Sequence, residues 1–229
     1  MVGKDKERLA LARLQRVKAA YQSFIKLNYE HRAKDCGTCP TRGVCCTDEH
    51  FVNVNITRLE AVAIRETLAR TPRLDEKGRR AIYERARKAV KRYGLSAAGD
   101  TFAQTFSCPL YEPSAGCLVH RRAKPAPCSQ HACYDSWEDL PPASLQSRTE
   151  HRVEQLNEEV YGGAWAWLPL PLWLVLVDTE ADGAELEILA HEWSARRLNV
   201  ENSQRRRARQ IGKSTSHRRA SLPVIRLRA

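Results

Sequence analysis

Eight cysteines stand in two tight groups in this chain of 229 residues. The first group has the spacing C-x2-C-x5-C-C and the second has the spacing C-x8-C-x10-C-x4-C. Each group supplies four sulfurs, the number that a tetrahedral zinc ion or a four-iron cluster takes as ligands. The sequence therefore predicts a metal site built from two distant segments, in which each group closes one site alone or the groups share ligands. The predicted ligands are Cys36, Cys39, Cys45, Cys46, Cys108, Cys117, Cys128 and Cys133.

A disulfide framework is the competing interpretation, because the number of cysteines is even and one bridge stabilises a small chain by about 2–4 kcal/mol. Residues 1–13 are charged and contain no apolar secretory segment, so we expect a cytoplasmic location, where thiols stay reduced. Cys45 and Cys46 are adjacent and hard to bridge to each other. In an extended chain their side chains would point to opposite sides and serve two nearby centres. Inert buried thiols are a third interpretation, which fits scattered cysteines better than clustered ones.

Basic residues and histidines lie inside the cysteine segments. A site of four thiolates carries a charge of about −2 with either zinc or an oxidised four-iron cluster, so nearby cations would stabilise it. Surface solvation is the alternative for the basic side chains. A histidine would replace a sulfur as ligand or lie in the second shell, and eight cysteines already suffice for two sites. The candidates for the second shell are Arg42, His120, Arg121, Arg122, Lys124 and His131.

The motifs CGTCPTRGVCC and CPLYEPSAGCLVHRRAKPAPCSQHAC resemble the YkgJ-like family of zinc- or iron-chelating domains, often written CxxCxxCC. The resemblance covers Cys36 to Cys133, and its most specific part is the order of cysteine, glycine and proline positions in the second group. The chain departs from the family in a longer gap before Cys45, in His120 at a usually aromatic position, and in one extra residue between Cys117 and Cys128. The resemblance implies zinc or iron binding but no reaction, although some relatives carry the module beside an activity, as in flagellin lysine methylases.

No second set of residues indicates catalysis, so the sequence leaves open whether the chain is an enzyme. It lacks a dinucleotide-type glycine fingerprint, a Walker loop, a G-x-S-x-G elbow and an H-E-x-x-H motif. Soft thiolates suit zinc, copper(I) and iron–sulfur clusters alike, so the cofactor stays undecided between zinc and an iron–sulfur cluster. We expect a cytoplasmic metal-binding or metal-handling module. The alternatives are an iron–sulfur electron carrier or redox-enzyme subunit, and a zinc-ordered nucleic-acid-binding protein.

Helical periodicity predicts the elements that position the cysteines. Residues 5–33 form an amphipathic helix that leads into the first group. Its apolar stripe consists of Leu14, Val17, Tyr21, Phe24 and Ile25, and Arg13, Arg16, Lys18 and Lys26 lie off the stripe. The capping box Thr57-x-x-Glu60 opens a second helix that runs to about Ala69 before Pro72. Asp75 caps a third helix, with Ile82, Ala86, Ala89 and Tyr93 as its buried stripe, which ends at Gly94.

The second cysteine segment is loop-rich, because prolines interrupt it. Ser147-x-x-Glu150 begins or reinforces a further helix that ends at Gly162. The apolar run 164–177 is too short and too interrupted by proline to cross a bilayer, so no transmembrane segment is expected. We predict that this run is buried extended chain reaching a strand near 172–177. From Gly183 onward the spacing favours a helix over a hairpin.

The fold predicted from these patterns is mainly α with loop-rich cysteine segments and little strand, a small metal-organised single domain with a disordered basic tail. The predicted boundaries are an N-terminal helix (1–34), a cysteine-cluster domain (35–135), an extension of the same domain (136–200) and the tail (201–229). Residues 205–229 contain nine Lys and Arg and no acid, so nine of the net eleven positive charges lie there. This segment suits nucleic acid, an acidic partner or anionic lipid, with simple solubilisation as the alternative. The protein partner is unknown.

Overall fold

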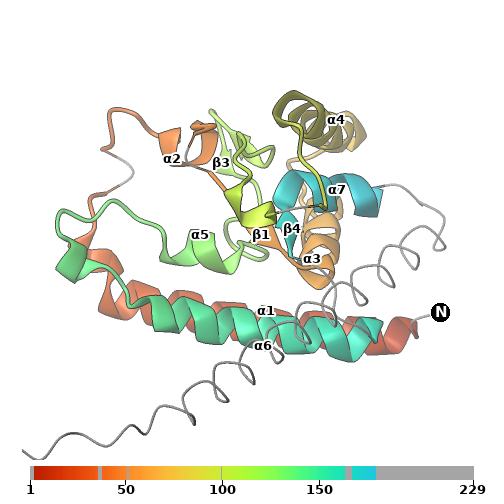
Figure 1. The fold of residues 1–229 in the computed structure, drawn as a ribbon, viewed down its shortest axis with the longest axis horizontal. Coiled ribbons are helices and arrows are strands. Elements are labelled where there is room, and N and C mark those ends of the chain that lie inside the picture. Colours follow the sequence, from red (N-terminus) through yellow and green to blue (C-terminus); the bar gives the residue numbers. More distant parts are fainter. Residues whose placement is uncertain (1–2, 36–37, 51, 99, 163–166, 179–229) are drawn as a thin grey trace, which may run out of the picture.

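The computed structural model describes residues 3–35, 38–50, 52–98, 100–162 and 167–178. Within these residues the chain is mainly helical with little strand, as the sequence predicts (Figure 1). Cys36, the expected helix after Gly183 and the basic tail lie outside the described residues. In the part of the chain that is described, no helix is long and apolar enough to span a bilayer.

Two long helices form the base of the molecule in Figure 1. They are α1 (Lys4–Asn28) and α6 (Ala143–Tyr161), and they lie side by side. Apolar side chains close the space between them and α3, because each helix carries an apolar stripe on one face. This cluster consists of Ala10, Leu14, Leu59, Val153, Leu156 and Val160.

The start of the chain follows the predicted helix with two differences. Helix α1 ends at Asn28, and a short 3-10 turn, η1 (Glu30–Arg32), precedes the first cysteine group. Leu14, Tyr21 and Ile25 are buried as predicted, but Phe24 is 44% exposed. The prediction for Lys18 is wrong: it was placed off the buried stripe, and it is only 3% exposed.

Capping signals fix the next two helices where the sequence predicts them. In α3 (Arg58–Ala69) the Thr57 hydroxyl accepts from the Glu60 N–H, and the Glu60 carboxylate accepts from the Thr57 N–H. Asp75 caps α4 (Glu76–Tyr93), and Gly94 ends it in the left-handed conformation with φ 62°. Ile82, Ala86 and Ala89 are buried in the core. These local signals set the bounds of both helices, and Asn157 on α6 adds a tertiary contact by accepting from the N–H of Leu59 at 3.0 Å.

The apolar run before Asp178 is the clearest departure from the sequence-based prediction. A strand was expected near 172–177, but α7 (Leu170–Asp178) is a helix, and the strand β4 (Leu168–Pro169) comes before it. Pro171 lies in the first helical turn, where its missing N–H costs no hydrogen bond. Strand β4 pairs antiparallel with β1 (Asn55–Ile56), in the register Ile56 opposite Leu168.

The main core lies where α3, α4 and α7 meet, and Trp173 on α7 is completely buried there. Helix α6 begins at Ala143, after Pro142, so Ser147 lies inside the helix and does not begin it. Gly162 ends α6 as predicted, with φ 69°. The structure thus joins the region after the cysteine segments to the same core as the helices between them.

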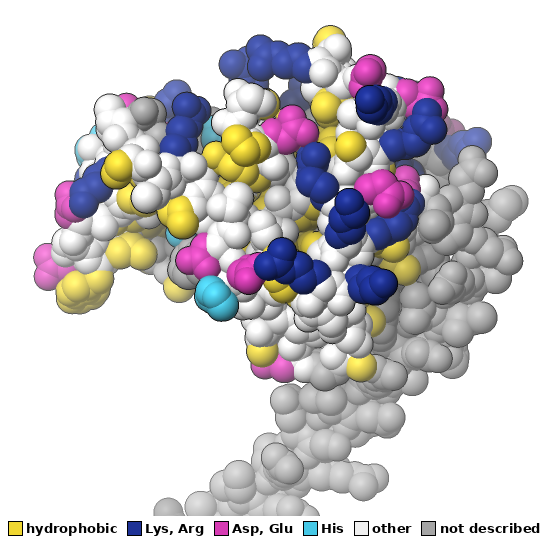
Figure 2. Space-filling model, turned by 90° about the horizontal axis from the view of Figure 1, so that it is seen from above, with side chains coloured by type: hydrophobic (Ala, Val, Ile, Leu, Met, Phe, Trp, Pro, Cys, Tyr) yellow, Lys and Arg dark blue, Asp and Glu magenta, His cyan; other side chains and the backbone are white. Residues whose placement is uncertain are grey.

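Four of the described cysteines lie on short elements above the α1–α6 base (Figure 1), and Cys39, Cys108 and Cys133 lie outside helices and strands. These elements are α2 (Val44–Thr47), the hairpin of β2 (Tyr111–Glu112) and β3 (Gly116–Cys117), and α5 (Ala126–Gln130). Two further 3-10 turns, η2 (Thr101–Ala103) and η3 (Trp137–Asp139), flank the second group. The face seen from above Figure 1 mixes Lys and Arg with Asp and Glu, without a surface of one sign (Figure 2).

Candidate metal centre

Helix α2 carries the adjacent pair Cys45 and Cys46. Its N-terminal residue, Gly43, has φ 90°, and a Cβ atom there would collide with the ring of Tyr111. The Tyr111 hydroxyl donates to the carbonyl of Arg42 at 3.2 Å, so the hairpin closes onto this turn. The pair was expected in extended chain, and that prediction is wrong. The two cysteines share one helical turn, and their thiols are hydrogen bonded to each other.

Main-chain hydrogen bonds bring the second cysteine group to the first. The N–H of Cys108 donates to the carbonyl of Cys46 at 2.8 Å. Cys117 lies opposite Tyr111 in the β2–β3 hairpin, and the N–H of Leu118 donates to the carbonyl of Leu110 at 3.0 Å. Three cysteines from three segments therefore converge above the main core.

Helix α1 positions the fourth segment, α5, which carries Cys128. The Tyr21 hydroxyl donates to Oε1 of Gln130 at 2.6 Å, and Nε2 of Gln22 donates to Oγ of Ser129 at 3.4 Å. Ala126 packs against Tyr21 and Ile25 in a small buried cluster. Because these contacts cover both ends of α5, the N-terminal helix determines where the Cys128 thiol lies.

The thiols of Cys46, Cys108, Cys117 and Cys128 form what we call the four-thiol cluster. Every pair among these four thiols interacts electrostatically. Burial, followed by the Cys45 and Cys117 thiols, raises the pKa of Cys46 to about 12, and burial followed by the Cys117 thiol raises the pKa of Cys128 to about 12. Burial likewise raises the pKa of Cys108 and of Cys117. All four thiols are partly buried, and Cys108 and Cys117 pack against the main core. Because their raised pKa values keep them protonated at neutral pH, an ion that binds them must displace protons.

Two of these sulfurs accept main-chain hydrogen bonds. The backbone of Leu110 bonds to Cys108 and that of Val119 bonds to Cys117, and each bond lowers the pKa of its thiol against the effect of burial. In each case the N–H belongs to the second residue after the cysteine. Such donors stabilise a thiolate, and they are the second-shell contacts that orient a metal ligand.

Two lysines act on the four-thiol cluster, and the sequence analysis identified only one of them. Lys124 lowers the pKa of Cys46, Cys117 and Cys128, as expected for a second-shell cation. Lys18 lowers the pKa of Cys117 and Cys128 from the buried face of α1. Lys18 was assigned to the polar face because it is charged; the available signal was its helical spacing, four residues after Leu14 and three before Tyr21.

The other proposed second-shell residues lie at the surface. Arg42, Arg121 and Arg122 are exposed, and so are His120 and His131. Desolvation and then the charge of Lys124 lower the pKa of both histidines. Both imidazoles therefore lie near this lysine, although neither is enclosed by the core.

Cys133 lies at a second junction of the two groups. The N–H of Lys34 donates to the carbonyl of Cys133 at 2.8 Å, and Ala33 pairs with Tyr134 in an isolated β-bridge. The Sγ atom of Cys39 lies 3.7 Å from Oγ1 of Thr41. The end of the second group thus meets the residues just before the first. The seven described cysteines, Cys39 and Cys45 among them, are free thiols.

The four-thiol cluster has the donor chemistry of a zinc or iron–sulfur ligand set, because its donors are soft sulfurs with main-chain N–H support. Among the described residues, no three His, Cys, Asp or Glu side chains are arranged to hold an ion as they stand. The sulfurs must therefore approach one another by side-chain rotation for all four to bind one ion.

Comparison of the chain with protein-family models, with curated proteins and with solved structures finds no match. The resemblance to the YkgJ-like family stays a prediction from the cysteine pattern. What the chain does must be argued from the geometry of its own residues.

Proposed function

We propose that this protein is a metal-binding module whose primary centre is the four-thiol cluster. The observation that carries this proposal is the mutual interaction of Cys46, Cys108, Cys117 and Cys128. These residues come from both sequence groups, which favours shared ligands over one closed site for each group. Cys36, Cys39, Cys45 and Cys133 are left to a second centre, which rests on the sequence pattern alone.

The residues of the cluster bind and orient an ion in three ways. Thiolates supply the charge and softness that zinc or iron takes as ligands. The N–H groups of Leu110 and Val119 hold two sulfurs in orientation, and Lys124 offsets negative charge. A zinc ion or iron–sulfur cluster bound here would supply a structural cross-link or, for iron, electron transfer.

Of two possible functions for a cysteine site, binding or transfer of metal is favoured over hydrolysis catalysed by zinc. Four cysteine ligands complete a tetrahedral zinc, whereas catalytic zinc keeps one position open for water or substrate. The cluster is also partly buried against the core, with Leu110 and Val119 beside it. An iron–sulfur electron carrier uses the same four ligands, so the identity of the metal distinguishes the two roles.

The test is elemental analysis with an absorption spectrum, on full-length protein purified without oxygen and without chelator. Zinc in a colourless protein supports the metal-binding or metal-handling module. Broad absorbance near about 400 nm with about four irons per centre supports the iron–sulfur alternative. Protein that carries no metal, and that takes up neither zinc nor iron after reduction of its thiols, contradicts the proposal.

A further inference from the structure

We propose that Lys18 is a positioning residue that compensates the charge of the four-thiol cluster, and that Glu60 holds it there. This inference rests on the proposed function, because it assigns Lys18 a role toward the same centre. It adds a buried ion pair that the cysteine segments do not contain, since Lys18 belongs to α1 and Glu60 belongs to α3.

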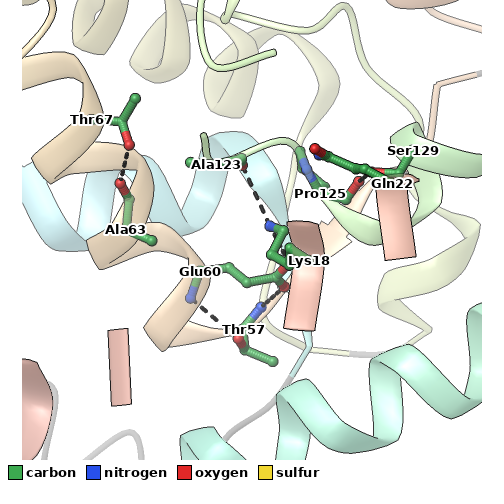
Figure 3. Close-up of polar contacts among 9 residues, drawn as sticks. All are labelled: Lys18, Gln22, Thr57, Glu60, Ala63, Thr67, Ala123, Pro125 and Ser129. Atoms are coloured by element: carbon green, nitrogen blue, oxygen red, sulfur yellow. Dashed lines mark hydrogen bonds and ion pairs between the residues drawn. The ribbon is translucent and has the colours of Figure 1, made fainter. Parts of the chain in front are cut away.

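The Lys18 ammonium is enclosed by three segments. Its Nζ atom donates to Oε1 of Glu60 at 3.0 Å and to the carbonyl of Ala123 at 3.4 Å (Figure 3). The side chains of Lys18 and Glu60 are 4% and 1% exposed. Ala123 lies in the loop between Cys117 and Cys128, so the second contact ties the ammonium to the backbone that carries these ligands.

Glu60 is fixed independently of Lys18. Its Oε2 atom accepts from the N–H of Thr57 at 3.2 Å, and its own N–H donates to the Thr57 hydroxyl at 3.3 Å. One oxygen therefore completes the capping box while the other holds the ammonium. This division of the two oxygens makes Glu60 a rigid anchor for a long and otherwise flexible lysine side chain.

The ammonium end of the ion pair lies toward the cysteine loop. Its Nζ atom donates to the carbonyl of Ala123, which lies between Cys117 and Cys128 in sequence, and its charge lowers the pKa of both thiols. Four thiolates around a divalent ion leave a charge of about −2 in a partly buried position. A fixed buried cation stabilises this charge more than an exposed one does, because water screens it less.

Stability alone does not account for burying these two charges. A buried ion pair contributes little to stability on average, and well-packed neutral residues often replace it without loss. A role in binding gives the pair a direct use. By linkage, an ion that binds the cluster then also strengthens the contact between α1, α3 and the Ala123 loop.

The first test compares the full-length wild type with the double variant Lys18→Met/Glu60→Gln. Glutamine keeps the capping box and methionine fills the volume of lysine, so the fold is retained while both charges are removed. Zinc affinity is measured without oxygen by competition with a chromogenic chelator, and thermal unfolding is followed in excess chelator. We expect affinity to fall about tenfold or more, the usual effect of losing an outer-shell partner. The matched control, Arg13→Gln/Glu159→Gln, neutralises the exposed ion pair between α1 and α6 and should leave affinity unchanged.

The single variant Lys18→Arg provides a second test that does not depend on the double variant. Arginine keeps the positive charge and can still pair with the Glu60 carboxylate, so the folded variant should keep most of the wild-type zinc affinity. A role that depends on the packing of the lysine, and not on its charge, predicts that Lys18→Arg loses affinity.

The outcomes separate the two proposals. Wild-type affinity in the folded double variant, or an equally large loss of affinity in a folded Lys18→Arg variant, overturns the role of Lys18 and leaves the metal-binding module intact. A wild type that takes up neither zinc nor iron overturns the metal-binding module itself, and with it the role of Lys18.

Discussion

The main-chain N–H of Cys108 donates a 2.8 Å hydrogen bond to the carbonyl of Cys46. This bond joins the two cysteine groups directly, although the whole of α3 and α4 separates them in sequence. Since backbone atoms form it, the junction does not depend on the conformation of either thiol. The four-thiol cluster therefore has a preformed backbone framework, and a bound ion has only to draw in side chains.

Replacing Cys117 by serine tests the cluster directly. Cys117→Ser removes one of four sulfurs and leaves a weaker hydroxyl donor in a partly buried site, so we expect loss of most of the bound metal and a lower melting temperature. Elemental analysis and thermal unfolding on the same preparation measure both effects. Ser114→Ala, in the exposed turn of the same hairpin, is the matched control. Full metal content in Cys117→Ser would exclude this residue as a ligand.

Chelation should loosen the cysteine segments and spare the helical base. The α1–α6 cluster is apolar and contains no cysteine, so its helices keep their packing without metal. Hydrogen exchange should therefore speed up at the Cys108 amide after chelator is added, while amides in the middle of α1 stay protected. Equal loss of protection in both regions would mean that the whole domain folds around the ion.

Gly43 is expected to tolerate no side chain. Gly43→Ala adds left-handed strain of about 1–2 kcal/mol and also drives a Cβ atom into the Tyr111 ring. Gly94→Ala carries similar strain at φ 62°, but nothing lies within 4 Å of the added atom. Denaturant unfolding should show the larger loss for Gly43→Ala, and only this variant should weaken zinc binding. Equal losses in both variants would argue against the contact with Tyr111.

Glu150 should destabilise the folded protein at neutral pH. Burial raises its pKa, and the charge of Glu60 adds to this, so the folded state holds the Glu150 proton more tightly than the unfolded state does. Ionised Glu150 therefore lowers the free energy of unfolding at pH values above its pKa in the folded state, and this loss disappears below its pKa in the unfolded state. Glu150→Gln should therefore raise stability at about pH 7 but not at about pH 4. Exposed Glu138→Gln is the control, and the same gain at both pH values would contradict the explanation.

Deleting residues 205–229 tests whether the basic tail binds nucleic acid. The tail carries nine of the net eleven positive charges, and the face in Figure 2 mixes both signs. We expect the full chain to bind a duplex oligonucleotide with strong salt dependence, and the truncated chain to lose this binding. Fluorescence anisotropy at two salt concentrations measures it. Undiminished binding after the deletion would assign the contact to the folded body.

Local signals in the sequence were sufficient for much of the fold. The capping box of Thr57 and Glu60 and the glycines that end α4 and α6 act within a few residues, so sequence spacing alone locates them. The run before Asp178 could not be assigned in this way. A short apolar segment fits a buried strand or a buried helix equally well. Here packing against α3 and α4 stabilises the segment as the helix α7.

The candidate site shows the same limit. Cysteine spacing identifies the thiols but does not show which of them come together. That depends on the Cys46–Cys108 hydrogen bond and on the hairpin register, both of which are tertiary contacts. Lys18 was placed on the polar face because it is charged, although its spacing, four residues after Leu14 and three before Tyr21, puts it on the apolar stripe. The partner that compensates its charge, Glu60, lies on another helix, and no pattern within α1 reveals that partner.

The pairing of β1 with β4 bears on how the protein can be dissected. Ile56 lies opposite Leu168, and α7 follows at once with Trp173 fully enclosed. A fragment cut to the cysteine segments alone would lack these partners and would expose the apolar surface that they cover. Such a minimal fragment should aggregate when expressed, so the smallest soluble unit should run from α1 through α7.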